Sequence, residues 1–312
     1  MKHFILIWLL TASSAFAQNI KLVVPFAIGG PSDTIAKLVQ RDLSRELNTT
    51  IVLDYKIGAG GDIGTAAVLA ADPKETVLLI HSVSLITNSI IKNQSFDIEQ
   101  LVPLTNLGTQ PLIFVASSSS SLQGKAWYKT TKNINYGSSG VGTSTHIAGE
   151  LLQKNTAMKL NHVPYKGQGQ VINDLLGGSL ESAFLWSNFA KPYIDDQKIK
   201  ALAVVSPTRI ASLPNIPTFK EIGVNGLEFQ PFNVLLANNT NNTQELVLVQ
   251  QAMSKILDNK ETRAEYEALG LTIPRSVTLP TKFIVDERKY YTKLLSNIST
   301  LSQKNNTLTP RF

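Results

Sequence analysis

The sequence has 312 residues, of which 43% are hydrophobic and 17% charged, and it contains no cysteine. These values exclude a disulfide-stabilised scaffold and suit a chain long enough to bury the cores of two ordinary domains. The formal net charge of +6 comes without a run of Lys and Arg or a basic stripe with interleaved aromatic residues, which argues against nucleic-acid binding. We expect the small positive excess to attract anionic solutes.

Residues 1–17 have the pattern of a secretory signal peptide. Lys2 precedes the apolar run 4–10, and an A-x-A cleavage site ends at Ala17, just before Gln18. No later apolar run approaches the roughly 18 residues of a membrane helix, so we expect a soluble exported protein. With no cysteine available for a lipid anchor, the expected location is the periplasm, with the signal peptide removed.

The first element after the signal peptide predicts an anion-binding cradle. An apolar strand expected at 20–24 runs into the glycine-rich turn 25–33, and the turn opens a helix expected at 35–47. Glycines let backbone N–H groups approach a ligand, and a helix start adds N–H groups without intrahelical partners and the positive end of the helix dipole.

The next segments predict α/β architecture with a mostly parallel sheet. Short apolar strands are expected at 51–53 and 77–80, and a further glycine turn at 58–62 opens a helix expected at 63–71. The strand-like run 112–115 is followed by the polar tract 117–121, which we interpret as the crossing into a second domain.

The second domain begins with a second cradle of the same design. A strand ending at Tyr136 runs into the Gly/Ser-rich turn 137–144, and the periodic apolar residues of a helix follow. Ser138, Ser139 and Thr143 concentrate hydroxyl groups in this turn. Two cradles, one on each lobe, would clamp a small carboxylate.

The remaining pattern predicts that the chain returns to the first domain. Apolar strands are expected at 183–185, 201–205 and 232–237, and helices at 246–257, 262–269 and 283–298. Two crossings imply a discontinuous first domain, which we expect to comprise residues 18–115 and 235–312, with residues 116–234 forming the second domain.

Seven motifs, spread over about 200 residues, occur in an order that resembles one protein family. They are VPFxxGGxxD at 24–33, GAGGxIG at 58–64, YGSSGxGTxxH at 136–146, HVPYKG at 162–167, DLLGG at 174–178, KALAV at 200–204 and LPxIPTxxExG at 213–223. Together they resemble the periplasmic solute-binding receptors of the tripartite tricarboxylate transporter system, often called the Bug family.

The resemblance implies a two-lobed periplasmic binding protein of a type II-like fold. Each lobe would be a mostly parallel sheet flanked by helices, the lobes would be joined by two crossing strands, and they would close like a hinge on a carboxylate. Amides, hydroxyls and ordered waters, rather than an arginine, would hold the anion. The implied partners are the permease subunits of a tripartite tricarboxylate transporter, and a monomer that is neither membrane-anchored nor an enzyme is expected. The expected ligand contacts are Phe26, Gly29, Gly30, Ser32, Asp33, Ser82, Ser138, Ser139, Gly142, Thr143, His146, Tyr165 and Asn188.

Two other functions fit parts of the sequence. A periplasmic sensor that docks on a signalling protein would use the same cleft. A serine hydrolase would use Ser139 or Ser138 as nucleophile and His146 as base, but the turn lacks G-x-S-x-G spacing and no acidic residue is evidently placed to orient His146. The histidines have no metal-ligand spacing, so no metal or cofactor is expected. The identity of the carboxylate stays open.

Overall fold

The computed structural model describes residues 19–92, 94–124, 126–240 and 242–296. The expected signal peptide lies outside the described residues, as does the end of the last expected helix beyond residue 296. Within the described part of the chain, no helix is long and apolar enough to cross a membrane.

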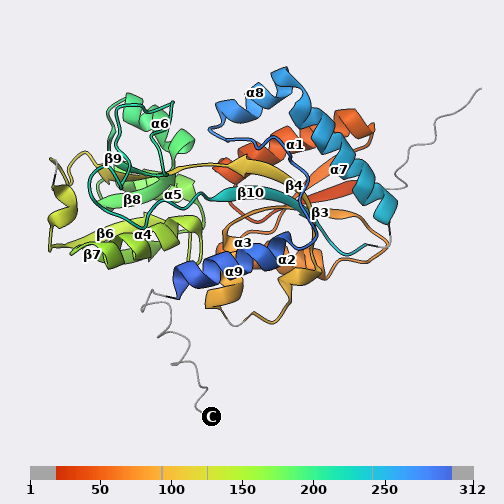
Figure 1. Cartoon of the computed structure of the whole chain (residues 1–312), viewed down its shortest axis with the longest axis horizontal. Coiled ribbons are helices and arrows are strands. Elements are labelled where there is room, and N and C mark those ends of the chain that lie inside the picture. Colours follow the sequence, from red (N-terminus) through yellow and green to blue (C-terminus); the bar gives the residue numbers. More distant parts are fainter. Residues whose placement is uncertain (1–18, 93, 125, 241, 297–312) are drawn as a thin grey trace, which may run out of the picture.

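The described residues form two lobes that lie side by side, each built on one five-stranded sheet (Figure 1). The first-lobe sheet has the order β2-β1-β3-β10-β4 and the second-lobe sheet the order β7-β6-β8-β5-β9. The first-lobe strands are β1 (Ile20–Val24), β2 (Ile51–Tyr55), β3 (Val77–Ser82), β4 (Val102–Thr109) and β10 (Phe232–Ala237). The second-lobe strands are β5 (Leu112–Ser117), β6 (Asn133–Ser138), β7 (Lys159–Pro164), β8 (Ser182–Trp186) and β9 (Ile199–Val205).

Each sheet contains one strand that runs against the other four. In the first lobe β10 is antiparallel to both β3 and β4, and in the second lobe β5 is antiparallel to both β8 and β9. The reversed strand is in each case the first strand formed after the chain crosses into that lobe. The predicted fold class, two lobes with mostly parallel sheets joined by two crossings, is therefore confirmed.

The first crossing lies earlier than the sequence predicts. The sequence pattern places the run 112–115 in the first domain, but β5 pairs with β8 and β9 in the second sheet, so the chain crosses at residues 110–111. All six residues of β5 are buried, as expected for a strand inside a sheet with both faces covered. The polar tract 117–121 begins at the last residue of β5 and continues into the turn after it. The division into 18–115 plus 235–312 and 116–234 remains a proposal, and strand pairing favours moving its first boundary to 110–111.

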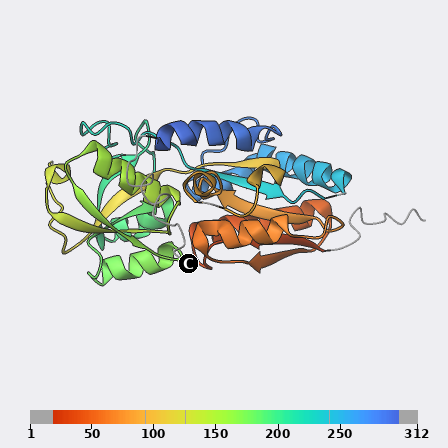
Figure 2. The same ribbon diagram turned by 90° about the horizontal axis from the view of Figure 1, so that it is seen from below.

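Helices cover both faces of each sheet (Figures 1 and 2). In the first lobe, α1 and α7 pack on one face with α8 against α7, while α2, α3 and α9 lie on the other. In the second lobe, α4 covers one face and α5 and α6 cover the other. The helix bounds are α1 (Pro31–Leu47), α2 (Asp62–Leu69), α3 (Ser84–Ile91), α4 (Ser144–Asn155), α5 (Gln168–Leu176), α6 (Ser187–Asp195), α7 (Thr243–Asp258), α8 (Lys260–Ala268) and α9 (Phe283–Leu295).

Helix α1 illustrates how the sequence determines this packing. Pro31 occupies its first turn, where the missing N–H is no loss, and Ile35, Val39 and Leu43 recur every four residues on one buried face. That face contacts alternate residues of β1, Leu22 and Val24. Burial of each such side chain contributes about 1.5–3 kcal/mol, so the helix start that carries the first cradle is held against a rigid sheet.

Candidate functional site

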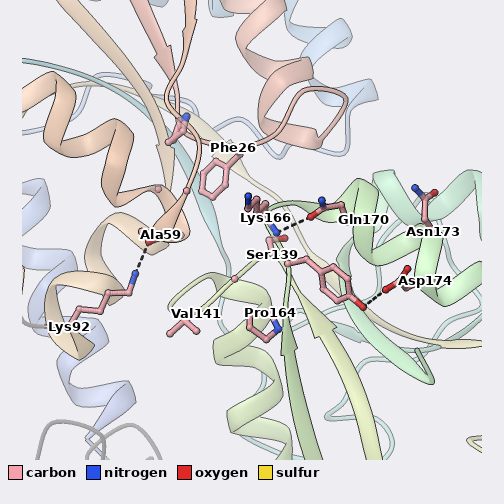
Figure 3. A pocket seen from close by; sticks show the side chains of 16 residues that line it. Phe26, Ala59, Lys92, Ser139, Val141, Pro164, Lys166, Gln170, Asn173 and Asp174 are labelled. Atoms are coloured by element: carbon pink, nitrogen blue, oxygen red, sulfur yellow. Dashed lines mark hydrogen bonds between the residues drawn. The ribbon is translucent and has the colours of Figure 1, made fainter. Parts of the chain in front are cut away.

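Two adjoining cavities lie between the lobes, where the loops after the parallel strands meet. The large chamber has a volume of about 640 Å³ and the small chamber about 30 Å³. Phe26 of the first lobe and Ser139 of the second line both, and Figure 3 shows Phe26 facing Ser139 across the large chamber. Ligands of open α/β sheets bind at this position, beyond the carboxyl ends of the strands.

The walls of both chambers come from both lobes. The large chamber is lined by Pro25, Phe26, Gly58, Ala59, Gly60, Gly61, Lys92, Ser139, Gly140, Val141, Pro164, Tyr165, Lys166, Gln170, Asn173 and Asp174. The small chamber is lined by Phe26, Ala27, Gly30, Pro31, Ser32, Ser82, Ser139, Thr143, Ser144, Thr145, Gly167, Gln168 and Trp186.

The small chamber lies between two helix starts, α1 from the first lobe and α4 from the second. The first N–H groups of a helix have no acceptor within it. In α1 this applies to Ser32, since the first intrahelical bond runs from the N–H of Thr34 to the Gly30 carbonyl at 3.2 Å. In α4 it applies to Ser144 and Thr145. Both predicted cradles therefore face one cavity, and both helix dipoles favour a negative charge there.

Asp33 braces the first cradle instead of lining a chamber. Its carboxylate accepts hydrogen bonds from the Tyr55 hydroxyl at 2.6 Å, the Gly29 N–H at 2.8 Å and the Lys37 ammonium at 2.8 Å. Burial raises the pKa of this carboxyl, but the three hydrogen bonds outweigh burial and hold the pKa below its ordinary value. Asp33 is thus ionised and engaged within the protein at neutral pH, and it fixes the turn before α1.

The threonine hydroxyls of the second cradle organise its loop. Thr143 caps α4, since its hydroxyl accepts from the His146 N–H at 3.4 Å, and it donates to the Gly140 carbonyl at 2.7 Å. With that hydrogen engaged, Thr145 must be the donor in the 2.9 Å bond between the two threonine hydroxyls. Thr145 also accepts from the Ser139 N–H at 3.0 Å. Neither threonine hydroxyl hydrogen is left for a ligand.

Two buried donor atoms of the small-chamber residues have no partner among the described residues. They are the hydroxyl Oγ of Ser139 and the amide Nε2 of Gln168. Buried polar groups are normally hydrogen-bonded, and a buried group without a partner costs about 1–3 kcal/mol. Two such donors beside one cavity indicate that a hydrogen-bond acceptor belongs there.

Ser138 and two histidines, of which His162 is only partly buried, form a group beneath the second cradle. Ser138 Oγ and His162 Nε2 are hydrogen-bonded at 2.6 Å, and the rings of His162 and His146 stack with centroids 4.2 Å apart. The Gly142 N–H donates to His146 Nδ1 at 3.1 Å, and His146 Nε2 lies 3.6 Å from the carboxylate of Glu150. Glu150 is the acidic neighbour of His146 that the sequence did not reveal. His146 thus holds the loop, and among the described residues no bond joins it to Ser139 Oγ, as a hydrolase would require.

The lobes contact each other through glycines of the turn 58–62 in the first lobe and of the second cradle. The Thr87 hydroxyl donates to the Gly142 carbonyl across the cleft. A Cβ on Gly142, whose φ is +81°, would overlap Asn88 Oδ1, and one on Gly60 would lie 2.6 Å from the Val141 carbonyl oxygen. Asn88 cannot simply swing away, because its amide donates to Asp62 at 2.8 Å. This close contact requires residues without side chains.

Some of the charged side chains that line the large chamber already have hydrogen-bond partners within the protein. Lys92 donates to Asp62 at 2.9 Å and to the Ala59 carbonyl at 2.6 Å, and the Tyr165 hydroxyl donates to Asp174 at 2.6 Å. Burial first, and the Asp174 carboxylate second, raise the pKa of Tyr165 to about 12, so it remains a neutral donor. Lys166 adds an exposed positive charge near Gln170 (Figure 3). In the described part of the chain, no group of three or more His, Asp or Glu side chains is arranged to hold a metal ion.

The structure brings together about half of the residues that the sequence singles out. Phe26, Gly30, Ser32, Ser82, Ser139, Thr143 and Tyr165 line one chamber or both. Gly29, Asp33, Ser138, Gly142, His146 and Asn188 line neither, and most of them support the loops from behind. Asn188 instead accepts from the Gln110 amide at 2.6 Å, at the first crossing between the lobes.

Sequence reasoning did not single out Gln168, Ser144 and Thr145 as ligand contacts. All three begin helices directly after a turn at the carboxyl end of a parallel strand, in α5 and α4. Their position at these helix starts is the feature of the sequence that could have identified them as ligand contacts. The motif HVPYKG ends at Gly167, and the polar residue after it enters the cleft because β7 points there.

The chain matches a known family over most of its length. The sequence profile described as "Tripartite tricarboxylate transporter family receptor" matches residues 35–299. The protein BugT of Bordetella pertussis is 28% identical over 281 residues, which cover 87% of this chain and 86% of BugT.

Solved structures share the fold. An R. palustris protein, Rpa4515, determined with adipate, superposes with a TM-score of 0.84 at 22% identity, covering 91% of this chain and 98% of that one. MatC from Rhodopseudomonas palustris, with bound malate, gives a TM-score of 0.76 at 21% identity, covering 92% of this chain and 99% of that one. At these identities the likeness establishes the two-lobed fold.

Proposed function

The chain belongs to the tripartite tricarboxylate transporter family of receptors, and on this premise we propose that it is a non-enzymatic solute-binding receptor that captures a small carboxylate between its lobes. Adipate and malate, bound by two proteins of the same fold, are both carboxylates.

The observation that carries the proposal is the chemistry of the small chamber. None of its lining residues, all of them in the described part of the chain, is charged, and its groups include two helix starts and the unpartnered donors of Ser139 and Gln168. An ionised carboxylate accepts about four hydrogen bonds and donates none. Such an anion enters a buried site only when hydrogen bonds replace its water, and this chamber offers donors from both lobes.

The sizes of the two chambers suggest how the ligand is divided between them. A water molecule needs a cavity of about 10–15 Å³, so the small chamber, at about 30 Å³, accommodates little more than the two oxygens of a carboxylate. The rest of the acid would pass between Phe26 and Ser139 into the large chamber, where Lys166 and Tyr165 lie.

The mechanism is capture by closure, followed by delivery. Because each lobe contributes a helix start, a bound anion links the lobes and favours the closed arrangement over an open one. The closed receptor would present its ligand to the permease subunits of a tripartite tricarboxylate transporter. The signal-peptide pattern at 1–17 supports a periplasmic location for this step, and the intact mass of the exported protein would show whether cleavage follows Ala17.

Ligand screening tests the proposal. The mature chain, unfolded and refolded to remove any co-purified ligand, is melted with mono-, di- and tricarboxylates, and with sugars and amines as controls. We expect at least one carboxylate to raise the melting temperature in a concentration-dependent way, by about 2.7 kcal/mol of stabilisation at one hundred times its Kd. A melting temperature raised by a sugar or an amine, and by no carboxylate, would overturn the proposal.

A further inference from the structure

Gln168 occupies an unusual position for a glutamine. It is the first residue of α5, only 2% exposed, and its side chain lines the small chamber beside the two helix starts. A long polar side chain this deeply buried needs partners for both ends of its amide. The structure supplies a partner for only one of them.

The backbone of β8 fixes the orientation of the amide. The N–H of Trp186, the last residue of β8, donates to Gln168 Oε1 at 3.1 Å. If the amide were flipped, its NH2 group would face the Trp186 N–H, donor against donor. Oε1 therefore stays on Trp186, and Nε2 is the buried end that has no partner among the described residues. The end of the Gln168 amide that is free for a ligand therefore offers hydrogens and no acceptor.

The two helix starts add N–H groups, which can only donate, to the Gln168 NH2 group. The Ser139 hydroxyl, which has no described partner, can donate to an anion as well. A primary amide that turned its own NH2 group toward Gln168 Nε2 or a helix start would place donor against donor. An ionised carboxylate accepts at every position.

From this geometry we propose that Gln168 is a specificity-determining residue, which makes the small chamber select a terminal carboxylate and reject the corresponding primary amide. The inference rests on the proposed function, because it assumes that the ligand's inner end lies in this chamber. The inference adds the chemical group that the small chamber recognises, a carboxylate, and the side chain that recognises it, Gln168.

Gln168→Glu is the sharpest test, because glutamate has nearly the same shape. One carboxylate oxygen still accepts from the Trp186 N–H, while the other replaces Nε2 and faces the bound anion. Measured by calorimetry at pH 8 with the acid found in the ligand screen, the affinity should fall about 100-fold or more, because a donor becomes a like-charged acceptor.

Gln251→Glu is the matched control. Gln251 lies in α7 of the first lobe, is exposed and lines neither chamber. The variant carries the same added charge, so an affinity within about 3-fold of the wild type would separate local contact from the general field of the protein.

Each outcome is informative. If the buried glutamate of the Gln168→Glu variant were protonated, its O–H group could donate to the ligand, and binding would weaken by about tenfold for each pH unit between 7 and 9 as this proton is lost. Such a pH dependence would mean that binding needs a donor at this position, and it would support the proposal. Wild-type affinity of Gln168→Glu at every pH would overturn it.

The wild-type protein provides a test that needs no variant: it should bind the acid at least 100-fold more tightly than its primary amide, and equal binding would contradict the inference. Either contradicting result would leave carboxylate binding by the wild-type protein intact, so failure of this inference can be distinguished from failure of the proposed function.

Discussion

At the scale of single residues, Ser139 and Thr143 differ in what their hydroxyl hydrogens do. The Ser139 hydroxyl is buried at the junction of the two chambers with no described partner, whereas Thr143 donates to Gly140 and caps α4. A ligand would therefore gain a hydrogen bond from Ser139, and only an ordered loop from Thr143.

We predict separate consequences for the two substitutions. Ser139→Ala should weaken carboxylate binding by about 1–3 kcal/mol, because a charged acceptor loses a buried donor, and it should leave the melting temperature nearly unchanged. Thr143→Val should lower stability by about 1 kcal/mol through the lost cap. Calorimetric titration and thermal melts measure both quantities. Unchanged affinity in Ser139→Ala would place the ligand elsewhere.

His81 gives the protein a predicted acid sensitivity. It is 1% exposed at the end of β3 behind Phe26, and its Nδ1 accepts from the Ser82 N–H at 2.9 Å. Burial lowers its pKa from 6.5 to about 4. The unfolded chain binds this proton as the pH drops through 6.5, whereas the folded chain does so only near 4, so the free energy of unfolding falls across this window.

The expected loss from His81 is about 3 kcal/mol between pH 6.5 and 4. Denaturant unfolding at several pH values, compared between the wild type and His81→Gln, measures it. The other histidines are present in both proteins and cancel in the difference. We expect a shallower decline in the variant, and parallel curves would show that His81 does not titrate in this way.

At the scale of elements, the glycine turn 58–62 and the second cradle both form chamber walls and bring the lobes into contact. Gly60 in the turn before α2 faces Val141, and Gly142 in the turn before α4 lies against Asn88 of α3. These contacts join the two lobes directly beside the chambers, so closure depends on the same turns that form the walls of the site.

Gly142→Ala should therefore weaken ligand binding by about tenfold or more, because the added methyl overlaps Asn88 and holds the lobes apart. Gly124→Ala is the matched control: its φ of +77° imposes similar backbone strain, but a Cβ there meets nothing within 4 Å. Titration calorimetry on both variants isolates the contact between the lobes. Equal affinities would mean that this contact has no part in binding.

At the scale of the whole molecule, local patterns predict the architecture well. The alternation of strands with helices and the glycine turns after β1 and β6 depend on neighbouring residues, which sequence reasoning can follow. The first crossing is misplaced in the prediction because the sheet that β5 joins is decided by pairing with β8 and β9, about 70 to 90 residues later. No local pattern carries that information.

The site is predicted only in part, for the same reason. Asp33 is expected from the sequence to touch the ligand, but Tyr55, 22 residues later, engages its carboxylate. Gln168 was missed because its role depends on the Trp186 N–H, 18 residues away, which fixes the amide. The glycines and hydroxyls of a cradle can be recognised in a sequence, whereas the direction of each hydrogen bond depends on the fold.

The central claim is that one anion is held by both lobes, and small-angle X-ray scattering tests it most directly. The radius of gyration of the refolded, ligand-free mature chain is compared with that of the same sample saturated with the carboxylate that raises its melting temperature. The account predicts a smaller radius with ligand, because binding to two helix starts in opposite lobes shifts the population toward the closed form. A rise in melting temperature with no change in radius would contradict it, since the anion would then bind without drawing the lobes together.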